Sequence, residues 1–158
     1  MLCYYFAYGS NNDPNRMMVR KAEFYKRELG ILHDYTWVLN YQKEDGTAAA
    51  NIEEQPGGYV YGTLYTGTEN TLSALDVFEG VDYDCYRRKI VNIEISSGET
   101  VEATVYVANP EKCCDGLAVR RSYLDHCLKG RDLIPDSFTT FMEQFTNIVE
   151  VYSNVVYA

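Results

Sequence analysis

The chain has 158 residues, of which 46% are hydrophobic and 23% charged, and this composition excludes a wholly disordered, collagen-like or membrane-spanning protein. Fourteen Lys and Arg against 23 Asp and Glu give a formal net charge of -9, which repels a phosphate backbone and excludes nucleic acid as a partner. Fifteen tyrosines stand out, because such rings can line a pocket while each hydroxyl still makes a hydrogen bond.

The five cysteines indicate a reducing compartment. Their number is odd, Cys113 and Cys114 are adjacent, and no pair has the Cys-x-x-Cys spacing. The apolar N-terminus has no basic leader and is far shorter than a bilayer-spanning helix, so we expect a strand there. We therefore predict a cytoplasmic protein with reduced thiols and no membrane association.

The first elements are a strand and a short helix. The apolar run 3–8 has strand length and stops at Gly9 and Ser10. Asp13 followed by Pro14 is typical of an N-cap and the first helical position, which predicts a short helix through Arg20.

Three strands are expected next. Residues 35–41 alternate with period 2, which indicates a strand with one buried face, and residues 44–46 form its turn. Residues 48–52 and 59–65 predict two further strands. Proline and glycine at 55–58 favour a tight reversal between them.

A second helix is predicted after Thr68, its N-cap. Glu79 is its last residue, and Gly80 can adopt the left-handed conformation that ends it. The apolar side chains on its buried face are Leu72, Leu75 and Phe78.

The rest of the chain predicts a hairpin and two helices. Residues 86–95 and 101–108 form the hairpin, and the helices cover 117–128 and, after a cap at Asp136, 138–148. The tail 149–157 is expected to add an edge strand. The order of elements lacks regular strand–helix alternation, which predicts an α+β fold. We expect a mixed or antiparallel sheet that curls into a small β-barrel with flanking helices, in one domain over 1–158.

The turn Tyr8-Gly9-Ser10-Asn11 joins a strand end to a helix start and is the first candidate site. Its backbone N–H groups can hold a carboxylate or an oxyanion, although an ordinary strand-to-helix turn is the alternative. A nucleophilic Ser10 is disfavoured, because no Gly-x-Ser-x-Gly motif is present. The two histidines, His33 and His126, lie in unrelated segments.

The second candidate is Glu79, which apolar residues flank at a helix C-terminus. Desolvation and the helix dipole both raise the pKa of a carboxyl group there, toward the range that suits a general base. A solvated surface glutamate is the alternative. Asp82 and Asp84 lie nearby, but no calcium or zinc pattern is present, so solvated carboxylates are favoured over a metal site.

Taken together, these segments resemble the gamma-glutamylcyclotransferase family, including its gamma-glutamylamine cyclotransferase and AIG2-like members. The resemblance spans most of residues 4–108. It rests on YFAYGSN (5–11), GTLY (62–65), and LDVFEGV (75–81) followed by Tyr86. It implies a small barrel with flanking helices, no metal or cofactor, and conversion of gamma-glutamyl amines or peptides into 5-oxoproline and a free amine.

The resemblance also implies roles for single residues. Glu79 matches the catalytic glutamate, which takes a proton from the substrate's α-ammonium group and returns it to the departing nitrogen. The substrate-binding residues are Tyr8, Gly9, Ser10, Asn11, Tyr86 and Tyr106. The N–H groups of the loop 8–11 are implied to hold the α-carboxylate end of the substrate. The expected partner is a small gamma-glutamyl substrate, and a homodimer is left open.

Two residues depart from the family pattern. Asn12 stands where the family often has a hydrophobic residue, and Asp84 stands where it often has glycine. A carboxylate at Asp84 near the mouth of the site favours a cationic leaving group. These departures also keep a non-catalytic binding or regulatory domain on the same fold as an alternative. The third hypothesis for the function is an acyl hydrolase that uses Ser10 or a cysteine as its nucleophile.

Overall fold

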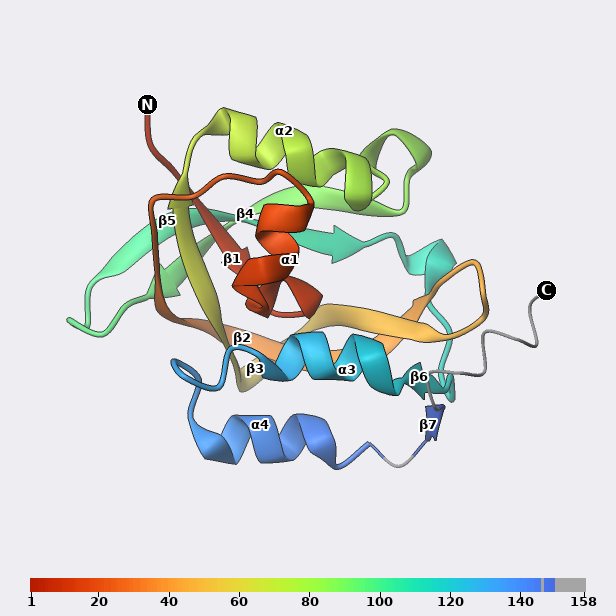
Figure 1. Ribbon diagram of the computed structural model, residues 1–158. Helices are drawn as coiled ribbons and strands as arrows, with labels where there is room; N and C mark the ends of the chain where they lie inside the picture. The colour runs from red at the N-terminus through yellow and green to blue at the C-terminus, as the bar shows by residue number, and fades with distance from the viewer. Residues whose placement is uncertain (146, 150–158) are drawn as a thin grey trace.

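A closed five-stranded barrel forms the centre of the computed structural model, which describes residues 1–145 and 147–149 (Figure 1). The strand order is β1-β3-β2-β4-β5, and β1 pairs antiparallel with β3 but parallel with β5. The mixed α+β barrel predicted from the sequence is confirmed. The strands are β1 (Cys3–Ala7), β2 (Lys26–Gln42), β3 (Ala48–Gly67), β4 (Tyr86–Glu94) and β5 (Thr100–Ala108).

Helices flank the barrel on two sides. In Figure 1, α2 lies above the barrel and α1 lies in front of it, whereas α3 and α4 lie below. Two short strands, β6 (Val119–Arg120) and β7 (Ile148–Val149), pair in parallel beside α3. No helix in the described part of the chain has both the length and the apolar character needed to cross a membrane. The helices are α1 (Pro14–Val19), α2 (Glu69–Phe78), α3 (Arg121–Leu128) and α4 (Asp136–Glu143).

The ends of α1 and α2 form as their sequences predict. The Asp13 side chain accepts a hydrogen bond from the Asn15 N–H at 2.9 Å, and Pro14 occupies the first helical position. Glu79 is the C-cap of α2, and Gly80 follows with φ 61°, in the left-handed region that favours glycine. The Glu79 side chain is therefore held at a defined helix end.

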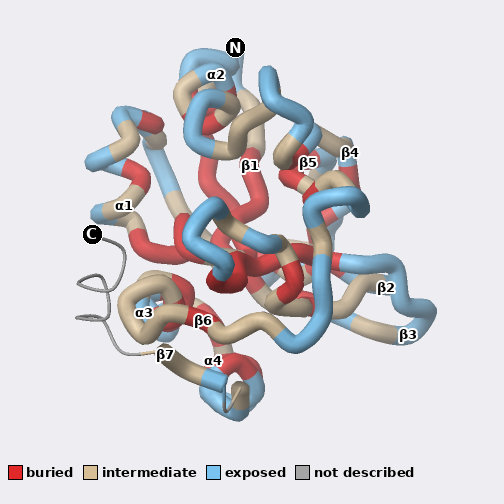
Figure 2. The backbone as a smooth tube through the Cα atoms, turned by 90° about the vertical axis from the view of Figure 1, so that its right-hand side faces the viewer, coloured by how far each residue is buried: buried red, intermediate tan, exposed pale blue. Residues whose placement is uncertain are grey.

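Strand β1 is the shared wall of two hydrophobic cores. Phe6, and Tyr8 just after the strand, belong to the core inside the barrel, whereas Tyr5 and Ala7 belong to the core beneath α1 and α2. This alternation is the period-2 geometry of a strand with both faces buried. Figure 2 shows β1 as one of the most continuously buried segments. The loop that follows β1 is consequently fixed from both sides.

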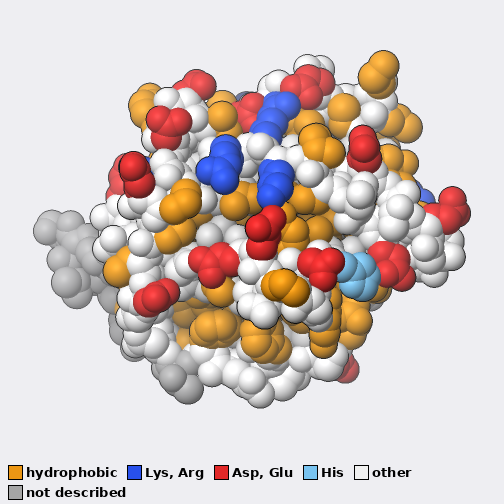
Figure 3. All heavy atoms as spheres, turned by 180° about the vertical axis from the view of Figure 1, so that it is seen from behind, with side chains coloured by type: hydrophobic (Ala, Val, Ile, Leu, Met, Phe, Trp, Pro, Cys, Tyr) orange, Lys and Arg blue, Asp and Glu red, His pale blue; other side chains and the backbone are white. Residues whose placement is uncertain are grey.

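Charged side chains are mostly on the surface. On the back of the molecule, acidic side chains are spread over the whole face, and basic ones gather near its upper centre (Figure 3).

The tight reversal predicted at 55–58 is wrong. Strand β3 continues through these residues and pairs with β2 on both sides of them, from His33 with Tyr59 to Tyr35 with Glu54. A bulge absorbs the extra residues, and the Gly57 N–H donates to Asp34 Oδ1 at 3.0 Å. Long antiparallel pairing with β2 overrides the local turn signal. Strand β2 is also longer than predicted, because it begins at Lys26 rather than at residue 35.

The C-terminal third differs from the prediction in its boundaries. Helix α3 begins at Arg121 rather than near residue 117, and α4 ends at Glu143, so Ile148 lies in β7 instead of a helix. Phe78, expected on the buried face of α2, is 53% exposed. Of the edge strand expected over 149–157, only residue 149 is described, and residues 150–157 lie outside the described residues.

Gly62 is required by close packing between β3 and β1. A Cβ atom there would collide with the Ala7 carbonyl oxygen and the Phe6 ring. We expect Gly62→Ala to lower the free energy of unfolding by about 1–3 kcal/mol, because both neighbours are fully packed. Urea denaturation measures this change, and an unaltered midpoint would contradict the close approach.

Candidate functional site

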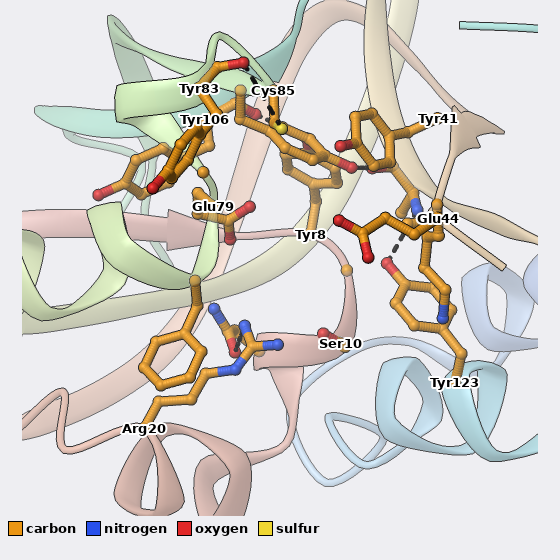
Figure 4. A pocket seen from close by; sticks show the side chains of 18 of the residues that line it. Tyr8, Ser10, Arg20, Tyr41, Glu44, Glu79, Tyr83, Cys85, Tyr106 and Tyr123 are labelled. Carbon is orange, nitrogen blue, oxygen red and sulfur yellow. Dashed lines mark hydrogen bonds between the residues drawn. The ribbon is translucent and has the colours of Figure 1, made fainter. Parts of the chain in front are cut away.

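A cavity of about 370 Å³ lies where the end of β1, the end of α2 and the β2–β3 turn meet. Figure 4 shows side chains from these elements, and from α3, pointing into it. All the predicted site residues line it: Tyr8, Gly9, Ser10, Asn11, Glu79, Tyr86 and Tyr106. The structure therefore brings together residues that are far apart in sequence, whereas their individual roles stay predictions.

Seven tyrosines make up much of the cavity wall: Tyr5, Tyr8, Tyr41, Tyr83, Tyr86, Tyr106 and Tyr123. Among the predicted binding residues, the Tyr8 hydroxyl donates to the Tyr106 carbonyl at 2.6 Å, and the Tyr86 hydroxyl donates to the Ala50 carbonyl at 2.7 Å. Burial raises the pKa of Tyr8 and of Tyr86 well above the ordinary value, so both stay neutral. Their hydroxyl protons are bound within the protein, and their rings form a wall that limits water.

The loop after β1 packs closely against its neighbours. A Cβ atom on Gly9 would lie 3.1 Å from the Tyr123 hydroxyl and 3.2 Å from the Ala50 Cβ, so a larger residue would force this wall to shift. Ser10 and Asn11 are 8% and 3% exposed.

Arginines on α1 fix the side chains of this loop. Arg16 Nε donates to Ser10 Oγ at 3.0 Å, and Arg20 Nη1 donates to Asn11 Oδ1 at 3.1 Å. The main-chain N–H groups of Ser10 and Asn11 have no acceptor among the described residues, as expected at the first turn of a helix. They remain as donors for a bound anion.

The Glu79 carboxylate faces the cavity from the end of α2 (Figure 4). Desolvation by the surrounding protein raises its pKa from 4.5 to about 7, although the positive charges of Arg20 and Arg16 act in the opposite direction. Within the described part of the chain, no group donates a hydrogen bond to this carboxylate. The direction of this shift agrees with the expectation from the sequence, and a carboxyl group with such a pKa can both accept and release a proton near neutral pH.

Neither of the two departures from the family pattern lines the cavity. Asn12 is fully buried behind the loop, where its Oδ1 accepts from the Thr63 hydroxyl at 2.9 Å. Asp84 is exposed in a left-handed turn with φ 56°, outside the cavity lining. The acidic side chain that does line the cavity at the β2–β3 turn is Glu44, next to Lys43. The leaving-group preference based on Asp84 stays a prediction, because Asp84 itself does not line the cavity but its neighbours Tyr83 and Cys85 do.

Sequence reasoning missed several cavity residues, among them Arg20, Tyr41 and Tyr123. The only local signal for Arg20 is its position four residues after Arg16, which places both on one face of a short helix. Tyr41 and Tyr123 have no local signal, because they reach the cavity only when the barrel closes and α3 packs against it.

Neither histidine lines the cavity. His33 pairs with Glu94 at 2.6 Å, and His126 pairs with Asp13 at 2.8 Å. The described residues contain no group of three or more His, Cys, Asp and Glu arranged to hold a metal ion. Ser10 and Cys85, which both line the cavity, therefore have no imidazole base beside them.

Comparison with known proteins identifies similar sequences and structures. The family profile described as "Gamma-glutamyl cyclotransferase, AIG2-like" matches residues 5–125. The Bacillus subtilis protein YkqA, whose name assigns it provisionally to the gamma-glutamylcyclotransferases, is 35% identical over 94 residues, covering 58% of this chain and 33% of YkqA. Bovine gamma-glutamylcyclotransferase is 28% identical over 109 residues, covering 65% of this chain and 57% of the bovine protein. The matches thus span from a third to just over half of these relatives' lengths.

Solved structures show the same fold. The YkqA crystal structure superposes with a TM-score of 0.80 at 27% identity, over 90% of this chain and 53% of that chain. A structure named gamma-glutamyl cyclotransferase has the same TM-score of 0.80, at 19% identity, over 99% of this chain and 98% of that chain. At such low identity the second match shows the fold alone.

The half-buried Glu79 carboxylate makes folding pH-dependent. The pKa of Glu79 is about 7 in the folded chain and 4.5 in the unfolded chain. This difference contributes folding stability that is fully present below pH 4.5 and is lost as the pH rises through 7. The free energy of unfolding of Glu79→Gln, relative to that of the original chain, is therefore expected to increase by on the order of 3 kcal/mol between pH 4.5 and pH 7. Above pH 7 this difference should stay constant. Thermal or urea unfolding at pH 5 and pH 8 measures the difference, and a constant difference would contradict the burial of this charge.

Proposed function

We propose that this chain, which belongs to the gamma-glutamyl cyclotransferase, AIG2-like family, converts a gamma-glutamyl amine or peptide into 5-oxoproline and a free amine. The observation that carries the proposal is a carboxylate with a pKa of about 7 that faces a tyrosine-lined cavity. The same cavity is lined by a loop whose main-chain N–H groups are free to bind an anion. Groups suited to acid–base catalysis and to anion binding thus line the same cavity.

The reaction requires a proton acceptor rather than an enzyme nucleophile. The nucleophile is the substrate's own α-nitrogen, which is an ammonium ion at neutral pH and becomes reactive after losing a proton to Glu79. This nitrogen then forms a bond to the γ-carbonyl carbon, and the bond from that carbon to the leaving nitrogen breaks. Glu79 delivers its proton to the leaving nitrogen. The α-nitrogen loses a second proton to solvent and keeps one hydrogen in the lactam.

Ring closure depends mainly on the conformation of the substrate. The two reacting atoms belong to one molecule, so a cavity that folds the chain into a near-attack shape supplies a high effective concentration. The fixed rings of Tyr8 and Tyr86 suit this task, because their hydroxyls are already bonded to the protein. The same walls limit the water that would compete for the γ-carbonyl carbon.

The alternatives have less support. The hypothesis of a non-catalytic binding domain is based on Asn12 and Asp84, and neither residue lines the cavity. An acyl hydrolase that uses Ser10 or Cys85 lacks a histidine in the cavity lining to act as its base.

Replacement of the proposed base tests the assignment. Glu79→Gln keeps the shape of the side chain but cannot accept a proton, so we expect release of 5-oxoproline from gamma-glutamyl-lysine and gamma-glutamyl-alanine to fall at least ~100-fold. The matched control is Asp82→Asn, which removes an exposed carboxylate three residues further along the chain, outside the cavity. Retained activity in Glu79→Gln would assign the base to another group.

The pH dependence of the reaction tests the protonation state. Glu79 accepts a proton only when it is ionised, so kcat/KM is expected to rise with pH through a midpoint near 7, the pKa of this group in the free protein. Initial rates of 5-oxoproline formation between pH 5 and pH 9 measure the midpoint. A rise centred near 4.5 would mean that the acting carboxyl group is solvated.

A further inference from the structure

Arg20 lies in the cavity but has no role among the functions considered so far. It is the C-cap residue of α1, and its side chain extends toward the space that Glu79 faces from α2 (Figure 4). The guanidinium carbon lies 5.0 Å from the centroid of the Phe78 ring, which covers one face of the group. Nη1 donates to Asn11 Oδ1 at 3.1 Å. A guanidinium has five N–H donors, and this bond uses one of them.

Arg20 forms no ion pair among the described residues, although its charge acts on the Glu79 carboxylate across the cavity. Among the described residues, neither Arg20 nor Arg16 lies within 4.0 Å of a carboxylate oxygen, whereas most other arginines form an ion pair: Arg27, Arg88, Arg120, Arg121 and Arg131. Burial and the nearby charge of Arg20 both lower the pKa of Arg16, so two positive groups lie close together beside the cavity. In a chain with a net charge of -9, such an unpaired cluster is suited to bind an anion.

The proposed substrate supplies one anion in every case. Whatever amine leaves, a gamma-glutamyl group carries an α-carboxylate on the same carbon as the α-nitrogen. Guanidinium binds a carboxylate through two parallel hydrogen bonds, which fixes its orientation as well as its position. We propose that the Arg20 guanidinium binds the α-carboxylate of the gamma-glutamyl group; this inference rests on the proposed function.

This assignment explains how the α-nitrogen meets its base. Arg20 and Glu79 face the cavity from α1 and α2, so a carboxylate on Arg20 directs the neighbouring α-nitrogen toward Glu79. Ser10 and Asn11 line the same cavity, and their main-chain N–H groups can add neutral donors for this carboxylate.

Two product-like ligands that differ only in charge test the inference. The probes are 5-oxoproline and its neutral amide, and calorimetry or NMR titration measures their affinities. We expect the original chain to bind the acid at least tenfold more tightly than the amide, because hydrogen bonds to charged groups are the stronger kind. In Arg20→Gln this preference should fall to about twofold, with the affinity for the amide unchanged.

Two further variants make the result specific. Arg87→Gln removes the same charge from an exposed position on β4 and should keep the full preference for the acid. Arg20→Lys keeps a positive charge without the planar guanidinium group and should retain part of the preference for the acid. This variant can also be measured if Arg20→Gln does not fold. Equal binding of acid and amide by the original chain, or full preference in folded Arg20→Gln, would overturn the inference.

The binding measurement is independent of turnover. If the original chain prefers the acid and Arg20→Gln loses this preference, the carboxylate site stands even when no gamma-glutamyl compound is turned over. In that case only the proposed reaction is excluded, and the carboxylate-binding role of Arg20 is kept. If turnover occurs but Arg20→Gln keeps its preference, the reaction stands and the role of Arg20 is excluded.

Discussion

The free-energy cost of burying the Glu79 carboxylate is the constraint on which the site depends. The group is half-buried at a helix end within a tyrosine-lined cavity, so its charged form lacks part of the hydration that keeps an ordinary glutamate acidic. Helix α2 resists displacement because Asp76, one turn before Glu79, accepts two hydrogen bonds from Arg88 on β4, at 2.9 and 2.7 Å. The hydroxyl of Tyr106 on β5 bonds to the same carboxylate at 2.7 Å. The β4–β5 hairpin thus holds the proposed base in place.

The opposite side of the cavity depends on β1. Because its two faces belong to different cores, the strand is fixed in register by Phe6 on one side and Tyr5 on the other. The chain therefore leaves β1 at a defined position, where Gly9 fits closely against Ala50 and Tyr123. Packing of apolar side chains in the fold thus determines where polar donors lie in the site.

Much of this arrangement could be predicted from the sequence, because its signals are local. The N-cap at Asp13, the helix end at Glu79 and Gly80, and the alternation in β1 each follow from a few neighbouring residues. The continuous course of β3 could not be predicted, because pairing with β2 overrides the turn tendency of Pro56 and the glycines beside it. Tyr123 enters the cavity from α3, 73 residues after Ala50, whose N–H donates to its hydroxyl. Such long-range contacts arise only from closure of the barrel and the packing of α3 against it.

The protonation of Glu79 itself provides the most direct test of the account. Carbon-13 NMR of side-chain carboxyl groups, with the Glu79 signal assigned by its loss in Glu79→Gln, follows the ionisation of this group without substrate. A carboxylate buried in the tyrosine-lined cavity should titrate with a midpoint near 7. A midpoint near 4.5, the value of a hydrated glutamate, would contradict the burial on which the proposed chemistry rests.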